Sequence, residues 1–167
     1  PAFIEEFVFR GIVMQPLRRY GDGFAVVMSA IVFGLVHGNL VQIPFAMVVG
    51  LIIGFFVVKS NSLWVGIVIH LINNTASVVL TMLLSGVNDV LGNLVVLAYY
   101  GVLILLAIVF LAVLIDRQRW VFRKNPVPSP LSLGKRVSAF LFNPGMILAF
   151  LAMVYMTSFY VKFVGRW

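Results

Sequence analysis

Five ionisable side chains lie inside otherwise apolar stretches of this sequence, and they are the residues that could do chemistry there. They are Glu5, Glu6, Arg10, His37 and His70. A charged side chain at the centre of a bilayer costs about 2.5–3.5 kcal/mol, so such residues are expected only where they serve an interior site. Carboxylates and imidazoles can both accept a proton from water, which makes general acid–base chemistry the first hypothesis.

The spacing of these residues separates a structural pair from a reactive group. Glu6 and Arg10 are four residues apart, so in a helix they share a face and can form an ion pair. Glu5 is rotated by about 100° from Glu6 and therefore points elsewhere. His70 and Asn74 are also four residues apart, which presents an imidazole and an amide side by side.

Helical rise places these polar groups at a similar depth. At 1.5 Å per residue, Glu5, His37, His70 and Asn74 lie roughly 17–22 Å along their stretches from the ends on the basic side. Three separate segments are therefore expected to deliver polar groups to one level of the membrane.

The composition indicates that lipid is the solvent for most of the chain. Hydrophobic residues make up 62% of the 167 and charged residues 10%, whereas a soluble domain carries about 25% charged residues. Cysteine is absent, which excludes disulfides and thiol-based sites. The net charge of +7 comes from residues between the apolar stretches, as in cytoplasmic loops, so a nucleic-acid partner is not expected.

The predicted fold is all-α, a polytopic transmembrane helical bundle with about six hydrophobic segments. These run approximately over residues 1–17, 24–37, 41–58, 63–84, 90–115 and 144–164. We expect a core at 1–84, a fifth transmembrane helix within 85–115, a basic cytoplasmic linker at 116–143 and a C-terminal transmembrane helix within 144–167. The linker contains Pro126, Pro128 and Pro130, which favour an extended chain.

The chain starts at Pro1 without an initiator methionine, and a functional segment follows at once. We therefore expect that it continues a longer protein whose N-terminal helices precede it. Basic residues between alternate stretches predict a multi-pass membrane protein whose basic side faces the cytoplasm. We expect it in the plasma (inner) membrane of a bacterium, with lipid as a partner.

Three motifs on successive stretches resemble the CPBP family of intramembrane proteases. Residues 5–10 (EEFVFR) fit EExxxR, residues 33–37 (FGLVH) fit FxxxH, and residues 70–74 (HLINN) fit HxxxN. The family includes the type II CAAX prenyl endopeptidases and the bacteriocin-processing, Abi-like proteins. The resemblance covers about residues 1–84, half of the chain.

The resemblance implies an endopeptidase and gives four residues catalytic roles. Glu5 and His37 would activate the attacking water, and His70 and Asn74 would stabilise the oxyanion. The substrate would be a prenylated CAAX-type protein, or a bacteriocin or signalling-peptide precursor.

By the same resemblance, Glu6 and Arg10 would support the site by holding the first motif in place. Glu5, His37 and His70 are also the candidates for a Zn²⁺ site with an open position for water. Because the HExxH signature of common zinc proteases is absent, a mechanism without a metal or other cofactor is favoured.

Two other functions fit the same sequence. One is a non-enzymatic bacteriocin-immunity or peptide-handling membrane protein that keeps the fold. The other is a proton-coupled transporter in which Glu5, His37 and His70 form a relay. The intact motifs favour the protease.

Overall fold

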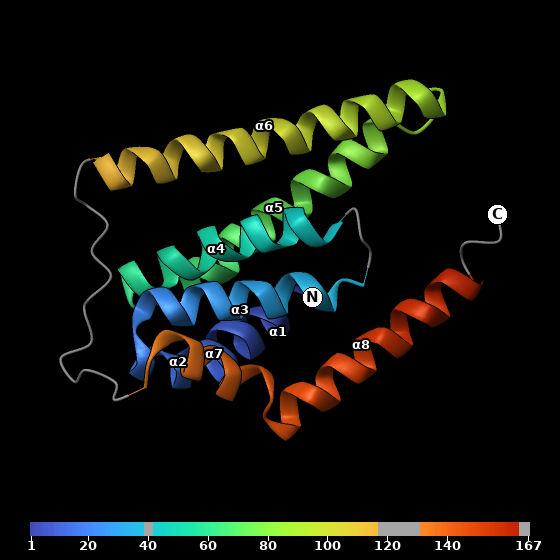
Figure 1. Ribbon diagram of the computed structural model, residues 1–167. Coiled ribbons are helices and arrows are strands. Elements are labelled where there is room, and N and C mark those ends of the chain that lie inside the picture. Colours follow the sequence, from blue (N-terminus) through green and yellow to red (C-terminus); the bar gives the residue numbers. More distant parts are fainter. Residues whose placement is uncertain (39–41, 117–130, 164–167) are drawn as a thin grey trace.

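Every predicted apolar stretch is helical in the computed structural model, which describes residues 1–38, 42–116 and 131–163 (Figure 1). Within these ranges the structure has no strand, which confirms the all-α prediction. The elements are α1 (Ala2–Glu6), η1 (Phe7–Val13), α2 (Met14–Leu17), η2 (Arg18–Tyr20), α3 (Asp22–Val36), α4 (Gln42–Ser60), α5 (Leu63–Leu83), α6 (Asp89–Asp116), α7 (Leu133–Leu141) and α8 (Pro144–Phe163).

The first stretch is one helical segment with an unusual middle, since η1 is a π-helix between α1 and α2. π-Helical turns are rare and frequently mark functional sites. In η1 the Phe9 carbonyl accepts hydrogen bonds from the Met14 N–H and, at 2.9 Å, from Ser29 Oγ of α3. The π-helical turn is therefore hydrogen-bonded to α3.

Helices α3 and α4 pack closely because α4 carries glycine at two positions of the interface. A Cβ on Gly50 would lie 3.1 Å from Ala30 Cα, and one on Gly54 would lie 3.0 Å from Val26 Cγ1. The GxxxG pattern at residues 50–54 therefore allows the two helices to pack closely.

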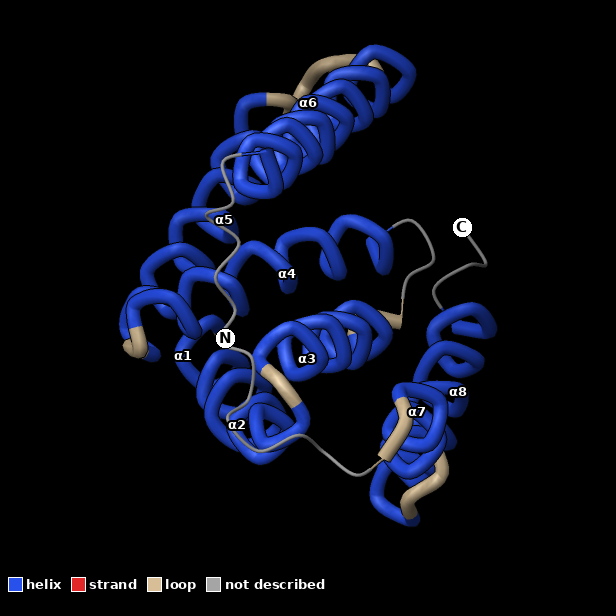
Figure 2. The backbone as a smooth tube through the Cα atoms, turned by 60° about the vertical axis from the view of Figure 1, so that its left-hand side comes forward, coloured by secondary structure: helices blue, strands red, loops and turns tan. Residues whose placement is uncertain are grey.

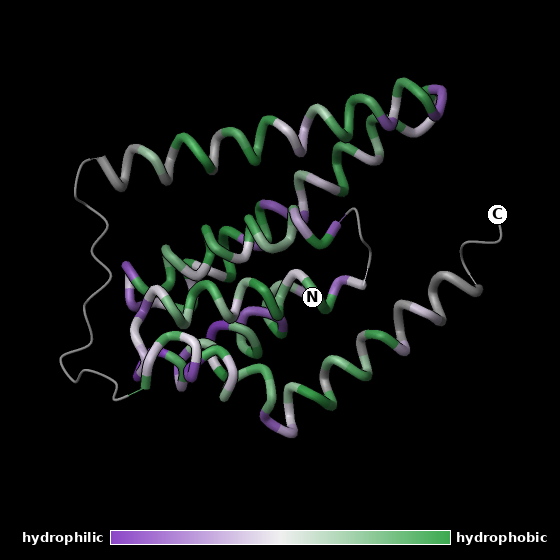
Figure 3. Tube along the Cα trace, in the orientation of Figure 1, coloured by the Kyte–Doolittle hydropathy of each residue, from purple (hydrophilic) through white to green (hydrophobic). Residues whose placement is uncertain are grey.

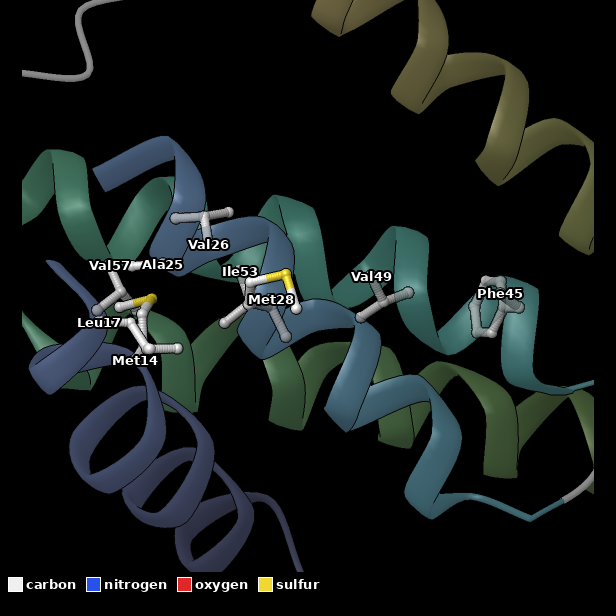
Figure 4. Close-up of a cluster of buried hydrophobic side chains, with 9 residues drawn as sticks. All are labelled: Met14, Leu17, Ala25, Val26, Met28, Phe45, Val49, Ile53 and Val57. Carbon is white, nitrogen blue, oxygen red and sulfur yellow. The ribbon is translucent and has the colours of Figure 1, made fainter. Parts of the chain in front are cut away.

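The apolar core lies between α2, α3 and α4 and is drawn in Figure 4. Its nine buried members are Met14, Leu17, Ala25, Val26, Met28, Phe45, Val49, Ile53 and Val57. Phe45 stands at one end of this cluster, far from Met14 and Leu17 at the other.

The C-terminal helices begin at asparagine N-caps and lie outside this core. Asn88 Oδ1 accepts the Leu91 N–H at 2.9 Å at the start of α6, and Asn143 Oδ1 accepts the Met146 N–H at 3.0 Å at the start of α8. In Figures 1 and 2, α6 and α8 flank the central helices on different sides.

The expected linker at 116–143 is not extended throughout, because its last part forms helix α7. Arg136 Nη1 of α7 donates to the Tyr20 carbonyl at 2.9 Å and thereby connects α7 with the first segment. The three prolines lie outside the described residues, and the helix begins only after them. The prolines therefore do not prevent residues 133–141 from forming a helix.

Two helices, α4 and α5, are long and apolar enough to cross a membrane among the residues that the structure describes. Helix α3 has 15 residues, about 22 Å at 1.5 Å per residue, which is less than the roughly 30 Å of a hydrocarbon core. Figure 3 shows polar residues at the turn between α5 and α6. The remaining predicted spans, and a multi-pass topology, stay predictions.

Candidate active site

The Glu6 carboxylate connects the first helical segment with α5. Its Oε1 accepts hydrogen bonds from Arg10 Nη1 at 2.8 Å and from His70 Nδ1 at 2.7 Å. All three side chains are buried. The predicted Glu6–Arg10 pair is thus confirmed, and the same carboxylate also fixes the orientation of the His70 ring, which the sequence did not predict.

Arg10 extends this network to α3 and α4. Its Nη2 donates to the Gly50 carbonyl at 3.1 Å, and its guanidinium lies 4.5 Å from the centroid of the Phe33 ring. The carboxylate, the carbonyl and the aromatic ring partly compensate the buried cation, although its Nε has no hydrogen-bond partner among the described residues. Arg10 therefore links the first motif to α3 and α4.

His70 reaches Glu6 because α5 approaches α1 at a glycine. A Cβ on Gly66, one turn before His70, would lie 2.7 Å from Val57 Cγ2 and 3.0 Å from Glu6 Oε2. Such distances force a neighbour to shift, so only glycine fits here without rearrangement. Gly66 therefore sets the separation at which the Glu6–His70 bond forms.

Replacing Gly66 by alanine is expected to destabilise the fold by about 1–3 kcal/mol, because the added methyl group overpacks the contact. Gly92→Ala is the matched control, since nothing lies within 4 Å of a Cβ at that helical position. The free energy of unfolding of the two variants would be measured side by side. Equal behaviour of the two variants would contradict the close approach at Gly66.

Glu5 differs from Glu6 in its surroundings. Its side chain is 31% exposed, and its Oε2 lies 3.7 Å from His70 Nε2. Glu5 faces a cavity of about 590 Å³, whereas Glu6 is fully enclosed. The predicted division between a tied carboxylate and one that points elsewhere is confirmed.

His37 lies in the wall of the same cavity at the end of α3. Its Nδ1 is 2.8 Å from the Phe33 carbonyl, which can only accept, so Nδ1 carries the proton and Nε2 keeps a lone pair in the neutral ring. Both histidine rings pack edge-on against Phe33, with centroid distances of 4.9 Å for His37 and 5.5 Å for His70. Phe33 thus positions both imidazoles.

One face of α5 supplies the other polar wall of the cavity. His70, Asn74, Ser77 and Val78 follow the i, i+4, i+7, i+8 spacing of a single helix face, and all four line the cavity. Asn74 Oδ1 accepts from Asn73 Nδ2 at 3.3 Å, so the Asn74 amide nitrogen can donate into the cavity.

The structure therefore places Glu5, His37, His70 and Asn74 around one cavity, with Glu6 directly behind them. They come from three helical segments, α1, α3 and α5, which are separated in the sequence. The three zinc candidates share the cavity wall but are not gathered as a metal-binding group, and no group of three such ligands occurs in residues 1–38, 42–116 and 131–163. The arrangement does not fit the candidate zinc site, and we derive no step through a metal.

The cavity also contains residues that sequence reasoning missed. Tyr100 of α6 and Phe45 of α4 form part of its wall, with ring centroids 4.3 Å apart. Both lie in apolar stretches without any motif. An aromatic residue in such a stretch carries no signal of its role until the helices are placed in space.

Comparisons with known proteins match the part of the chain that carries these residues. Residues 1–76 match the family model described as "Type II CAAX prenyl endopeptidase Rce1-like". Residues 1–76 are therefore similar to this family, and we call them the Rce1-like segment. The Rce1-like segment includes all three motifs and ends two residues after Asn74, so every predicted site residue lies inside it.

A curated protein named as a membrane peptidase is also similar to this chain. The Bacillus subtilis (strain 168) protein named "Putative membrane peptidase YdiL" is 30% identical over 80 residues, which are 47% of this chain and 33% of that protein. The chain thus matches about a third of the length of this relative. No solved structure matches the chain significantly. Together the Rce1-like segment and this relative support a membrane protease in general terms.

Proposed function

We propose that this protein is an intramembrane endopeptidase that hydrolyses a peptide bond in a membrane-associated protein or peptide. The observation that carries the proposal is the convergence of Glu5, His37, His70 and Asn74, from three separate helices, on one cavity. In a largely apolar chain, such a gathering of polar groups is costly unless it serves a reaction. The Rce1-like match over residues 1–76 supports the same reading.

Glu5 and His37 are the residues that would activate water. The Glu5 carboxylate is partly exposed to the cavity and can accept a proton, as a general base must. The Nε2 lone pair of His37 offers a second acceptor in the same cavity, since Nδ1 is bound to the Phe33 carbonyl. A water molecule held by these two acceptors is oriented with its own lone pair toward a bound peptide carbonyl.

His70 and Asn74 would stabilise the oxyanion. His70 Nδ1 lies 2.7 Å from the Glu6 carboxylate, which accepts a hydrogen bond from it, and Nε2 lies on the side of Glu5 at 3.7 Å from Glu5 Oε2. A ring that carries a proton on both nitrogens would therefore present Nε2–H to the cavity as a donor. The Asn74 amide provides a second donor, and a single oxyanion donor is worth about 2.7–4 kcal/mol in a well-studied protease.

The reaction follows from these positions. Water attacks the scissile carbonyl carbon while Glu5 takes its proton, and the carbonyl electron pair moves onto the oxygen beside His70 and Asn74. When the tetrahedral intermediate collapses, the C–N bond breaks and the protonated Glu5 returns the proton to the leaving nitrogen. Water is consumed, and a carboxylic acid and an amine are formed.

The proposal is tested with the full-length protein in liposomes and a panel of farnesylated CAAX-type peptides and hydrophobic precursor peptides. We expect cleavage of at least one peptide by the wild type at a single bond. Failure on the whole panel, combined with solute flux driven by a pH gradient, would instead support a transporter. Failure on both assays would favour a non-enzymatic peptide-handling protein.

Removal of metal ions is expected to leave the cleavage rate unchanged within about twofold, because the candidate ligands do not form a metal-binding group. The measurement is cleavage before and after dialysis against a chelator, with elemental analysis of the same samples. Stoichiometric zinc that is lost together with activity, and restores it on return, would contradict this expectation.

A further inference from the structure

The wall of the cavity combines polar and apolar surface. Glu5, His70 and Asn74 line it together with Phe45 and Tyr100, which contribute aromatic surface. Val49, Val78 and Val79 also line the cavity and add aliphatic surface. A peptide whose scissile bond lies at the polar residues would therefore have neighbouring groups against an apolar surface.

Tyr100 occupies a distinct position in this wall. It is half-buried on α6, packs against the core cluster and lies with its ring 4.3 Å from that of Phe45, tilted by 35°. Within the part of the chain that the structure describes, its hydroxyl has no hydrogen-bond partner. It is also the one cavity residue of the described set that comes from α6, outside the Rce1-like segment.

We propose that Tyr100, backed by Phe45, forms a subsite that selects an apolar group next to the scissile bond of the substrate, and that α6 thereby sets specificity for the site of α1, α3 and α5. This inference rests on the proposed function. The apolar group is either an aliphatic side chain of the peptide or a prenyl chain attached to it, since both would be buried against the same aromatic surface.

Packing gives the reason why Tyr100 can discriminate. Phe45 is buried in the core and fixed by its neighbours, so the Tyr100 ring rests on a rigid support. A rigid aromatic wall provides contact area at little cost in side-chain entropy. One methylene group more or less in a hydrophobic pocket changes the discrimination between two substrates by about 10–200-fold.

The test uses binding, so that it does not depend on turnover. The full chain carrying Glu5→Gln, in nanodiscs, is titrated with four labelled peptides that end in Cys-Leu-Leu-Ser or Cys-Ala-Ala-Ser, each with and without a farnesyl group on the cysteine. The same titrations are made after adding Tyr100→Ala, Tyr100→Phe or Tyr99→Ala. Tyr99 is the matched control because it is the adjacent tyrosine of α6 and, although its ring centroid lies 5.6 Å from that of Tyr100, it does not line the cavity.

We expect Tyr100→Ala to reduce one of two affinity ratios by about tenfold, either leucine over alanine or farnesylated over free peptide. The ratio that falls identifies the side chain or the prenyl group as the occupant. Tyr100→Phe should keep both ratios, and Tyr99→Ala should leave them unchanged.

Unchanged ratios in Tyr100→Ala would overturn the subsite, as would an equal change in Tyr99→Ala. Absence of binding by all four peptides would also overturn it. Cleavage by the wild type decides the proposed function separately, because it does not require that Tyr100 select the substrate.

Discussion

Glu5→Gln is expected to reduce the cleavage rate by about 10²–10⁴-fold, the range of a lost general base, while the protein keeps its fold. Glutamine has the shape of glutamate and can still hold water, but it cannot take the proton. Glu5 is partly exposed and makes no buried ion pair like that of Glu6, so its replacement removes little packing. The measurement is kcat on a cleaved peptide, with unfolding followed on the same preparation.

Asp89→Asn is the matched control, because Asp89 is an exposed carboxylate in the first turn of α6. Its rate should equal that of the wild type. If Glu5→Gln cleaved at the wild-type rate, Glu5 would not be the base, and the role proposed for the cavity carboxylate would be wrong. Glu5→Gln is therefore also the variant in which an uncleaved substrate can be trapped.

Arg10→Met is expected to destabilise the fold by about 3–5 kcal/mol, because it leaves the Glu6 carboxylate buried without its cationic partner. It also removes the hydrogen bond to the Gly50 carbonyl and the contact with Phe33. The free energy of unfolding would be measured in detergent micelles by denaturant titration. A loss of cleavage should accompany the loss of stability, since Glu6 orients His70.

Lys59→Met removes the same charge from an exposed position at the end of α4 and should change stability by less than about 0.5 kcal/mol. The double variant Glu6→Gln with Arg10→Met should recover part of the loss, because the uncompensated charge is gone. Equal stabilities for Arg10→Met and Lys59→Met would show that the buried ion pair does not stabilise the fold.

The helices could be predicted from the sequence because hydropathy and turn residues mark their ends. The predicted stretch 63–84 became Leu63–Leu83, and 144–164 became Pro144–Phe163. The common location of Glu5, His37, His70 and Asn74 also followed, since helical rise alone places residues of successive segments at comparable depth.

The contacts between helices could not be predicted in the same way. The Glu6–His70 bond depends on how closely α5 approaches α1 at Gly66, and the sequence of either helix alone does not specify that distance. Tyr100 lines the cavity because of where α6 lies, and no motif in the sequence indicated that position. Helix α7 was missed because the prolines before it dominated the pattern of the whole linker.

Hydrolysis by water that Glu5 activates in this cavity is tested most directly by incubating purified full-length protein with a substrate peptide in ¹⁸O-labelled water. The products are analysed by mass spectrometry. With the wild type we expect one new carboxyl group that carries ¹⁸O at a single cleavage position, and none with Glu5→Gln. Labelled product formed equally by both proteins, or no product from the wild type with any peptide of the panel, would contradict it.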